Sequence, residues 1–168
     1  MGDVSDNVNK EPGHNEIQPH VLRTHDISIG KELIFGEAEV GVPVVFGRDP
    51  ATPDPKYAST KTHNEIHVKL FDEEGKGIKH LSRRSLTITF TPKAYQITNL
   101  TNRSLSYETD PNSKKILSPK VPVEVPVGKM RNFKIEVAAG LLLGTQAIGG
   151  GTGKPDRVHT LLFKRGNI

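Results

Sequence analysis

Apolar and polar residues alternate along many short segments of this chain, which is the pattern of β-strands, because successive strand residues point to opposite faces of a sheet. Around residue 66, one predicted face holds Ile66, Val68 and Leu70, and the other holds His63, Glu65, His67 and Lys69. Other segments alternate in the same way, and their predicted core residues are Leu86, Ile88 and Phe90; Tyr95 and Ile97; and Phe133, Ile135 and Val137. No segment has the spacing of a long amphipathic helix.

The segment Val121–Val127 places four valines on one face. Its two prolines cannot donate hydrogen bonds to a neighbouring strand, so this strand is predicted to lie at a sheet edge. Strands are also predicted at 42–46, 104–109 and 161–164, which brings the number to about ten. Strands this numerous, without helices between them, favour a sandwich or a barrel. We therefore expect an all-β fold, an antiparallel β-sandwich of about 10–11 strands.

The 168 residues are enough for one domain and too few for two full-sized cores. Residues 1–16 are polar and nearly free of large apolar side chains, which predicts a disordered tail, and residues 17–168 are expected to form the domain. The N-terminus lacks the basic and apolar regions of a secretory signal. The longest apolar run, around 137–143, is far shorter than the ~20 residues of a membrane helix. We expect an intracellular protein, nuclear or cytoplasmic with the nucleus slightly favoured, that has no membrane partner.

Composition narrows the possible functions. The chain has no cysteine, which excludes disulfides, thiolate zinc sites, iron–sulfur clusters and cysteine nucleophiles. Its net charge of +4 favours anionic partners weakly. Only 5% of its residues are aromatic and it has no tryptophan, so it is poor in the side chains that stack on bases, and a nucleic-acid partner is disfavoured.

Two motifs invite a catalytic or cofactor-binding interpretation, and both fail on spacing. The glycine-rich segment Gly149–Pro155 lacks the first glycine of a phosphate-binding P-loop and carries Pro155 in place of the hydroxyl residue, so it is interpreted as a surface loop. His63 and His67 would stand about 13 Å apart on a strand, too far to share one metal ion. No serine nucleophile motif and no carboxylate pair is apparent. We predict a non-enzymatic domain with no catalytic residue, metal or cofactor.

Basic residues and serines lie together at two predicted strand ends. Gly47-Arg48 closes the strand at 42–46, and the segment Leu81–Leu86, which reads Leu-Ser-Arg-Arg-Ser-Leu, opens the next apolar strand. An arginine guanidinium and a serine hydroxyl are suitable donors for a phosphate group. Three long loops could carry such a site: residues 49–61, 72–84 and 140–156. Arginines at strand ends are also common on ordinary protein surfaces.

The order of these blocks resembles the forkhead-associated (FHA) domain over roughly Val42–Val137. The family pattern runs Gly-Arg, then Ser-Arg-x-His, then a strand ending near Asp/Asn-Leu-Ser, followed by Asn-Gly. In this chain Gly47-Arg48 and Ser82-Arg83 stand in that order, and Tyr95–Thr101 is the third block. The resemblance implies an eleven-strand β-sandwich whose loops at one end bind phosphothreonine peptides in signalling.

Carried over position by position, the resemblance implies five phosphopeptide-binding residues. Arg48 would contact the phosphate or the adjacent peptide, Ser82 would donate to the phosphate, and Arg83 would line the peptide. Thr101 and Asn102 lie in the following loop, where the family fixes the peptide backbone and the phosphate. Arg84 is a neighbouring candidate.

The chain departs from the family pattern at two places. Ser85 stands where the family has the histidine that supports the loops, and Asn102-Arg103-Ser104 stands where Asn-Gly is expected. These departures leave an alternative open, in which a degenerate FHA-like scaffold makes phosphate-independent protein contacts or dimerises. A basic nucleic-acid-binding β domain is a third interpretation, which the scarcity of aromatic residues disfavours.

Overall fold

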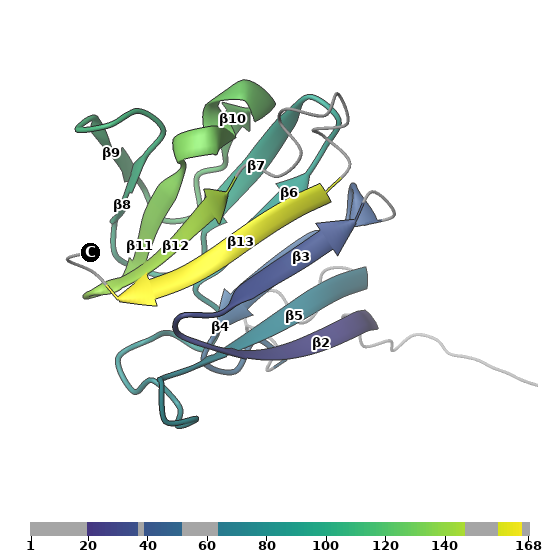
Figure 1. Ribbon diagram of the computed structural model, residues 1–168, viewed down its shortest axis with the longest axis vertical. Helices are drawn as coiled ribbons and strands as arrows, with labels where there is room; N and C mark the ends of the chain where they lie inside the picture. The colour runs from purple at the N-terminus through teal and green to yellow at the C-terminus, as the bar shows by residue number, and fades with distance from the viewer. Residues whose placement is uncertain (1–19, 37–38, 52–63, 147–157, 166–168) are drawn as a thin grey trace, which may run out of the picture.

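Two six-stranded β-sheets make up the part of the chain that the computed structural model describes, residues 20–36, 39–51, 64–146 and 158–165 (Figure 1). The strand order of the first sheet is β10-β7-β6-β4-β5-β2, with bounds β2 His20–Ser28, β4 Pro43–Gly47, β5 Asn64–Phe71, β6 Leu86–Phe90, β7 Ala94–Asn99 and β10 Val123–Pro126. The strand order of the second sheet is β3-β13-β12-β11-β8-β9, with bounds β3 Glu32–Gly36, β8 Leu105–Glu108, β9 Lys114–Leu117, β11 Lys134–Ala138, β12 Leu141–Gln146 and β13 Val158–Arg165. A 3₁₀ helix, Val127–Asn132, joins β10 to β11.

The all-β sandwich predicted from the alternating pattern is confirmed, and the described residues contain no α-helix. The segments with the clearest alternation form β5, β6, β7 and β11, and their predicted core residues are buried. The second sheet also contains a strand that was predicted as loop. Residues 141–146, part of the loop expected at 140–156, form β12, since Leu141 and Leu143 are buried against the core.

The first sheet is mixed, whereas the pattern predicted antiparallel pairing throughout. Strand β5 runs parallel to both of its neighbours, β4 and β2. A parallel pair needs a crossover of a dozen or more residues. The long connection between Gly47 and Asn64 provides that length for β4 and β5. The other strand pairs within the sheets are antiparallel.

The core lies between the two sheets and joins them through aromatic rings. Phe35 of β3 in the second sheet packs against Phe90 of β6 in the first, with ring centroids 5.3 Å apart. The Phe90 ring also packs edge-on against Tyr95 of β7, with ring centroids 5.2 Å apart. Phe35 and Phe90 are both fully buried. The three rings therefore fix the distance between the layers at one end of β6.

The proline-containing strand lies at a sheet edge, as its prolines predict. Strand β10 pairs with β7 alone and is the last strand of the first sheet. Of the four valines that the pattern places on one face, Val125 is buried, whereas Val121 precedes the strand and is 51% exposed.

Several predictions fall on residues outside the described part of the chain. They are the disordered tail at 1–16, the interpretation of Gly149–Pro155 as a surface loop, the position of His63, and most of the loop expected at 49–61. Within the described residues, no helix has the length and apolar character needed to span a membrane. The same residues contain no cluster of three side chains able to hold a metal ion.

Candidate functional site

The end of β4 and the segment before β6 lie side by side and are joined by backbone hydrogen bonds. The Arg48 amide donates to the Ser82 carbonyl at 2.9 Å, and the Asp49 amide donates to the Arg83 carbonyl at 3.1 Å. The Arg48 side chain follows the same segment, since its Nε donates to the Leu81 carbonyl at 3.1 Å. Two motifs more than thirty positions apart in the sequence, Gly47-Arg48 and Ser82-Arg83, thus form one unit.

Gly47 permits this close approach. A Cβ atom at Gly47 would lie 1.9 Å from the Arg83 carbonyl oxygen and 2.6 Å from its carbon. These are backbone atoms, so no side-chain movement could relieve the clash. The position therefore requires glycine, as is common where two backbone segments come close together.

Asn99 organises the loop that follows β7. Its side chain is fully buried, and Nδ2 donates to the carbonyls of Arg103 at 2.6 Å and Leu117 at 3.0 Å. Its Oδ1 accepts hydrogen bonds from the Thr101 amide at 2.8 Å and from the Thr101 hydroxyl at 2.7 Å. Asn99 belongs to the third block, Tyr95–Thr101, but sequence reasoning assigned roles only to Thr101 and Asn102. A buried asparagine at a strand end was the missed signal, because such a side chain can bond the backbone on both sides of a turn.

Ser82 and Thr101 open onto one cavity of about 270 Å³, here called the loop pocket. Its polar lining includes His80, Ser82, Thr101, Arg103, Ser104 and Glu136. Ser82 comes from the segment before β6, Thr101 from the loop after β7, and Glu136 from β11 of the other sheet. Glu136 Oε2 accepts a hydrogen bond from the Gly140 amide at 2.9 Å. Beside this one carboxylate, the lining offers the hydroxyls of Ser82 and Ser104 and the Arg103 guanidinium, which are donors that suit an anion.

The five residues predicted from the resemblance are partly brought together. Ser82 and Thr101 share the loop pocket, and Arg48 is held against the Leu81–Ser82 backbone next to it. Arg83 is exposed beside Ser82, and Asn102 is exposed in the loop after β7. Neither of these residues lines the pocket, and nor does Arg48. The pocket is also lined by three residues to which the resemblance assigned no role, namely His80, Arg103 and Ser104.

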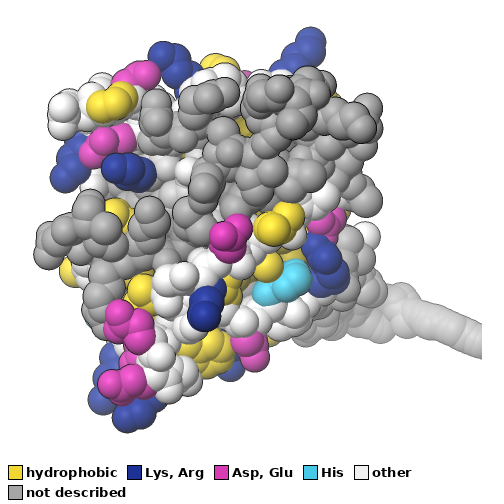
Figure 2. Space-filling model, in the orientation of Figure 1, with side chains coloured by type: hydrophobic (Ala, Val, Ile, Leu, Met, Phe, Trp, Pro, Cys, Tyr) yellow, Lys and Arg dark blue, Asp and Glu magenta, His cyan; other side chains and the backbone are white. Residues whose placement is uncertain are grey.

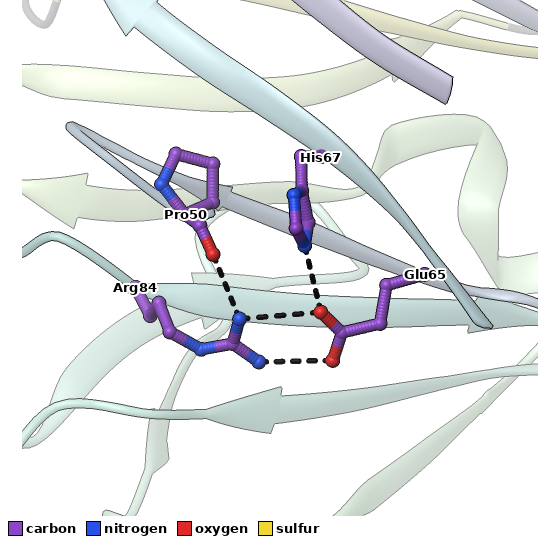
Figure 3. A network of polar contacts seen from close by, with 4 residues as sticks. All are labelled: Pro50, Glu65, His67 and Arg84. Carbon is purple, nitrogen blue, oxygen red and sulfur yellow. Dashed lines mark hydrogen bonds and ion pairs between the residues drawn. The ribbon is translucent and has the colours of Figure 1, made fainter. Parts of the chain in front are cut away.

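Arg84, the neighbouring candidate, points into the molecule instead (Figure 3). Its Nη1 donates to the Pro50 carbonyl at 2.7 Å and to Glu65 Oε1 at 3.2 Å, and its Nη2 donates to Glu65 Oε2 at 2.9 Å. His67 Nε2 lies 2.7 Å from the same Oε1. Arg84 is therefore occupied by internal acceptors.

Glu65 and His67, predicted on the polar face of their strand, are both buried, at 5% and 1% exposure. Burial alone would raise the pKa of Glu65. The hydrogen bonds from His67 and Arg84, together with their charge, outweigh that effect and lower the pKa to about 2. Glu65 is therefore ionised at neutral pH. Its carboxylate can be buried because Arg84 provides the opposite charge and hydrogen bonds to both of its oxygens.

Ser85 occupies the position where the resembled family has histidine. It is fully buried, and its hydroxyl donates to the Val137 carbonyl of β11 at 3.2 Å. Its amide donates to the Phe46 carbonyl at 2.8 Å, and its carbonyl accepts from the Leu100 amide at 2.9 Å. Ser85 thus connects the ends of β4, β7 and β11 around the site.

Comparison of the chain with protein-family models, curated proteins and solved structures gives no match. On the face drawn in Figure 2, basic and acidic side chains are interspersed among the described residues.

Proposed function

We propose that this protein is a non-enzymatic, phosphothreonine-dependent peptide-binding module of the FHA type. The observation that carries the proposal is the convergence of its three sequence blocks. Arg48 is hydrogen-bonded to the backbone of Leu81 and Ser82, and Ser82 shares the loop pocket with Thr101. These are the blocks, in the order, on which the resemblance to FHA domains rests.

The chemistry of the pocket supports a phosphate ligand. A phosphothreonine carries about −1.5 to −2 charges at neutral pH and three strong acceptor oxygens. The hydroxyls of Ser82 and Ser104 and the side chain of Arg103 line the pocket as donors, whereas the Thr101 hydroxyl already donates to Asn99 Oδ1. Charge-assisted hydrogen bonds to these groups would be lost with the unmodified peptide, so phosphorylation of the partner would switch binding on.

Rigid support of the loops is a second argument. Two buried side chains, Asn99 and Ser85, bond the backbone on either side of the pocket. Preorganised donors lose little conformational freedom when a ligand binds. The substitution of Ser85 for the family's histidine is therefore compatible with an ordered site. In this proposal the protein works in intracellular signalling and needs no cofactor.

The proposal is tested by substitution at the two residues that the resemblance and the geometry share. A degenerate phosphothreonine peptide library first selects a binding sequence. Isothermal titration calorimetry with that peptide then compares wild type with Ser82→Ala and Arg48→Ala. We expect each variant to bind at least about tenfold more weakly. Ser82→Ala removes a donor that lines the pocket, and a charge-assisted hydrogen bond contributes roughly 1.5–3 kcal/mol; Arg48→Ala removes a positive charge beside the pocket and the side chain that bonds the Leu81 carbonyl.

Two matched controls lie away from the loop pocket. Lys93→Ala removes one positive charge in the turn after β6, and Ser113→Ala removes one hydroxyl in the turn between β8 and β9. Both should bind like the wild type. If Ser82→Ala and Arg48→Ala keep wild-type affinity, or if no library peptide binds in a phosphate-dependent way, the degenerate-scaffold alternative replaces this proposal.

A further inference from the structure

The contacts of Arg84 point to a role in positioning the site rather than in touching a ligand. Its guanidinium bonds three acceptors, the two carboxylate oxygens of Glu65 and the carbonyl of Pro50. Its side chain is only 16% exposed, whereas the adjacent Arg83 is an exposed residue. The two consecutive arginines therefore have different surroundings, since Arg83 is exposed beside the site. Figure 3 shows Arg84 engaged by Glu65 and Pro50 inside the fold.

Arg84 ties together the two segments that form the Gly47-Arg48 and Ser82-Arg83 unit. Pro50 lies two residues after Arg48, and Arg84 lies two residues after Ser82. The hydrogen bond from Arg84 Nη1 to the Pro50 carbonyl, at 2.7 Å, joins them directly on the side away from Gly47. The backbone bonds from Arg48 and Asp49 to Ser82 and Arg83 then lie next to this link along the same pair of segments.

Glu65 fixes the orientation of the arginine fork. Its carboxylate accepts both terminal nitrogens of Arg84, and the His67 ring holds Oε1 at 2.7 Å from the other side. Both Glu65 and His67 lie on β5, which is hydrogen-bonded to β4 in the middle of the first sheet. Because a two-point arginine–carboxylate contact is directional, this arrangement sets where the segment before β6 lies relative to the sheet.

We infer that Arg84, oriented by Glu65, is a positioning residue that holds Ser82 and Arg48 in their ligand-binding arrangement. This inference rests on the proposed function for its link to peptide binding. A lysine at position 84 would keep the charge but lose the planar fork, so it could not bond Glu65 at two points and Pro50 together. Removing the link should loosen the paired segments while leaving the sandwich core closed, because Arg84 is absent from the hydrophobic core between the sheets.

Native-state amide hydrogen exchange, followed by NMR, measures this loosening without any ligand. The amides of Arg48 and Asp49 report the paired segments, and the amides of Ile88 and Ile97 in β6 and β7 report the core. In Arg84→Lys and Arg84→Gln we expect exchange at Arg48 and Asp49 to accelerate at least tenfold more than exchange at Ile88 and Ile97, because loss of the Glu65 ion pair lowers global stability as well. Lys129→Gln, which breaks the exposed ion pair with Asp110, is the matched control and should change none of these rates.

Calorimetry with the library-selected phosphothreonine peptide supplies the second readout. Both Arg84 variants should bind at least about tenfold more weakly than wild type and Lys129→Gln. Unchanged exchange at Arg48 and Asp49, or equal acceleration at core amides, overturns the positioning role. Selective acceleration with unchanged peptide affinity overturns its link to binding. If exchange at Arg48 and Asp49 accelerates selectively but the wild-type protein binds no phosphopeptide, Arg84 remains a positioning residue and only the proposed function is rejected.

Discussion

Replacing Gly47 by alanine should open the site at its closest backbone contact. The added Cβ would lie 1.9 Å from the Arg83 carbonyl oxygen and 2.9 Å from that of Ser82. Non-bonded carbon and oxygen atoms need more than 3 Å, so the segments must separate by roughly 1 Å or more. That movement weakens the hydrogen bonds from the amides of Arg48 and Asp49 to the same two carbonyls.

The expected cost follows from these two effects. Overpacking costs typically about 1–3 kcal/mol, and each weakened hydrogen bond adds roughly 0.5–1.5 kcal/mol. We therefore expect Gly47→Ala to lower the free energy of unfolding by about 2–6 kcal/mol. Gly36→Ala is the matched control, since Gly36 also ends a strand, β3, and a Cβ there meets no atom within 4 Å. Its effect should stay within about 0.5 kcal/mol.

Urea unfolding followed by far-ultraviolet circular dichroism measures both variants against wild type. The decisive comparison is between the losses in free energy of unfolding caused by Gly47→Ala and by Gly36→Ala, because both variants add the same methyl group at a strand end. If Gly47→Ala costs less than about 1 kcal/mol, or no more than Gly36→Ala, the close approach of β4 to the Ser82–Arg83 segment is wrong.

Three further changes test the core, the loop support and the buried charge. Phe90→Ala should cost about 3–5 kcal/mol in urea unfolding, because the ring is fully buried; a loss under about 1 kcal/mol would contradict its place in the core. Asn99→Ala leaves two carbonyls without their donor and should cost at least about 2 kcal/mol, whereas the exposed Asn102→Ala should cost under about 0.5 kcal/mol; equal losses would refute the support role. The pKa of Glu65 is lowered in the folded state from 4.5 to about 2, so its stabilisation is present above pH 4.5 and is lost as the pH falls towards 2. Wild type should lose about 3 kcal/mol more than Glu65→Gln over that range in acid-dependent unfolding, and parallel pH curves would contradict the ion pair.

The alternating pattern predicted much of the fold because it reports local burial. Leu86, Ile88 and Phe90 alternate with threonines and are buried in β6, and the prolines of β10 predicted an edge strand. The pattern carried no information about which strands pair. The parallel arrangement of β5 is a pairing between strands distant in the sequence, which no local alternation encodes.

The polarity of a side chain does not predict its exposure where a residue distant in the sequence supplies an ion-pair partner. Glu65 and His67 were placed on the polar face of their strand, yet both are buried, since Arg84 reaches Glu65 from 19 positions away. For the site, the resemblance predicted Arg48 and Ser82, and backbone hydrogen bonds bring these two residues together. The resemblance carried no role to Arg103, which lines the loop pocket because the loop after β7 takes its shape from the hydrogen bonds of Asn99.

The central claim is that the loop pocket recognises phosphate on threonine. Its most direct test is calorimetric titration of the wild-type protein with one library-selected peptide in three forms: phosphothreonine, phosphoserine and unphosphorylated. We expect the unphosphorylated form to bind at least about 100-fold more weakly, because the donors of the pocket lose their charged acceptor. The phosphoserine form, which lacks one methyl group, should bind about tenfold more weakly than phosphothreonine. Equal affinity for the phosphothreonine and unphosphorylated peptides would contradict the claim.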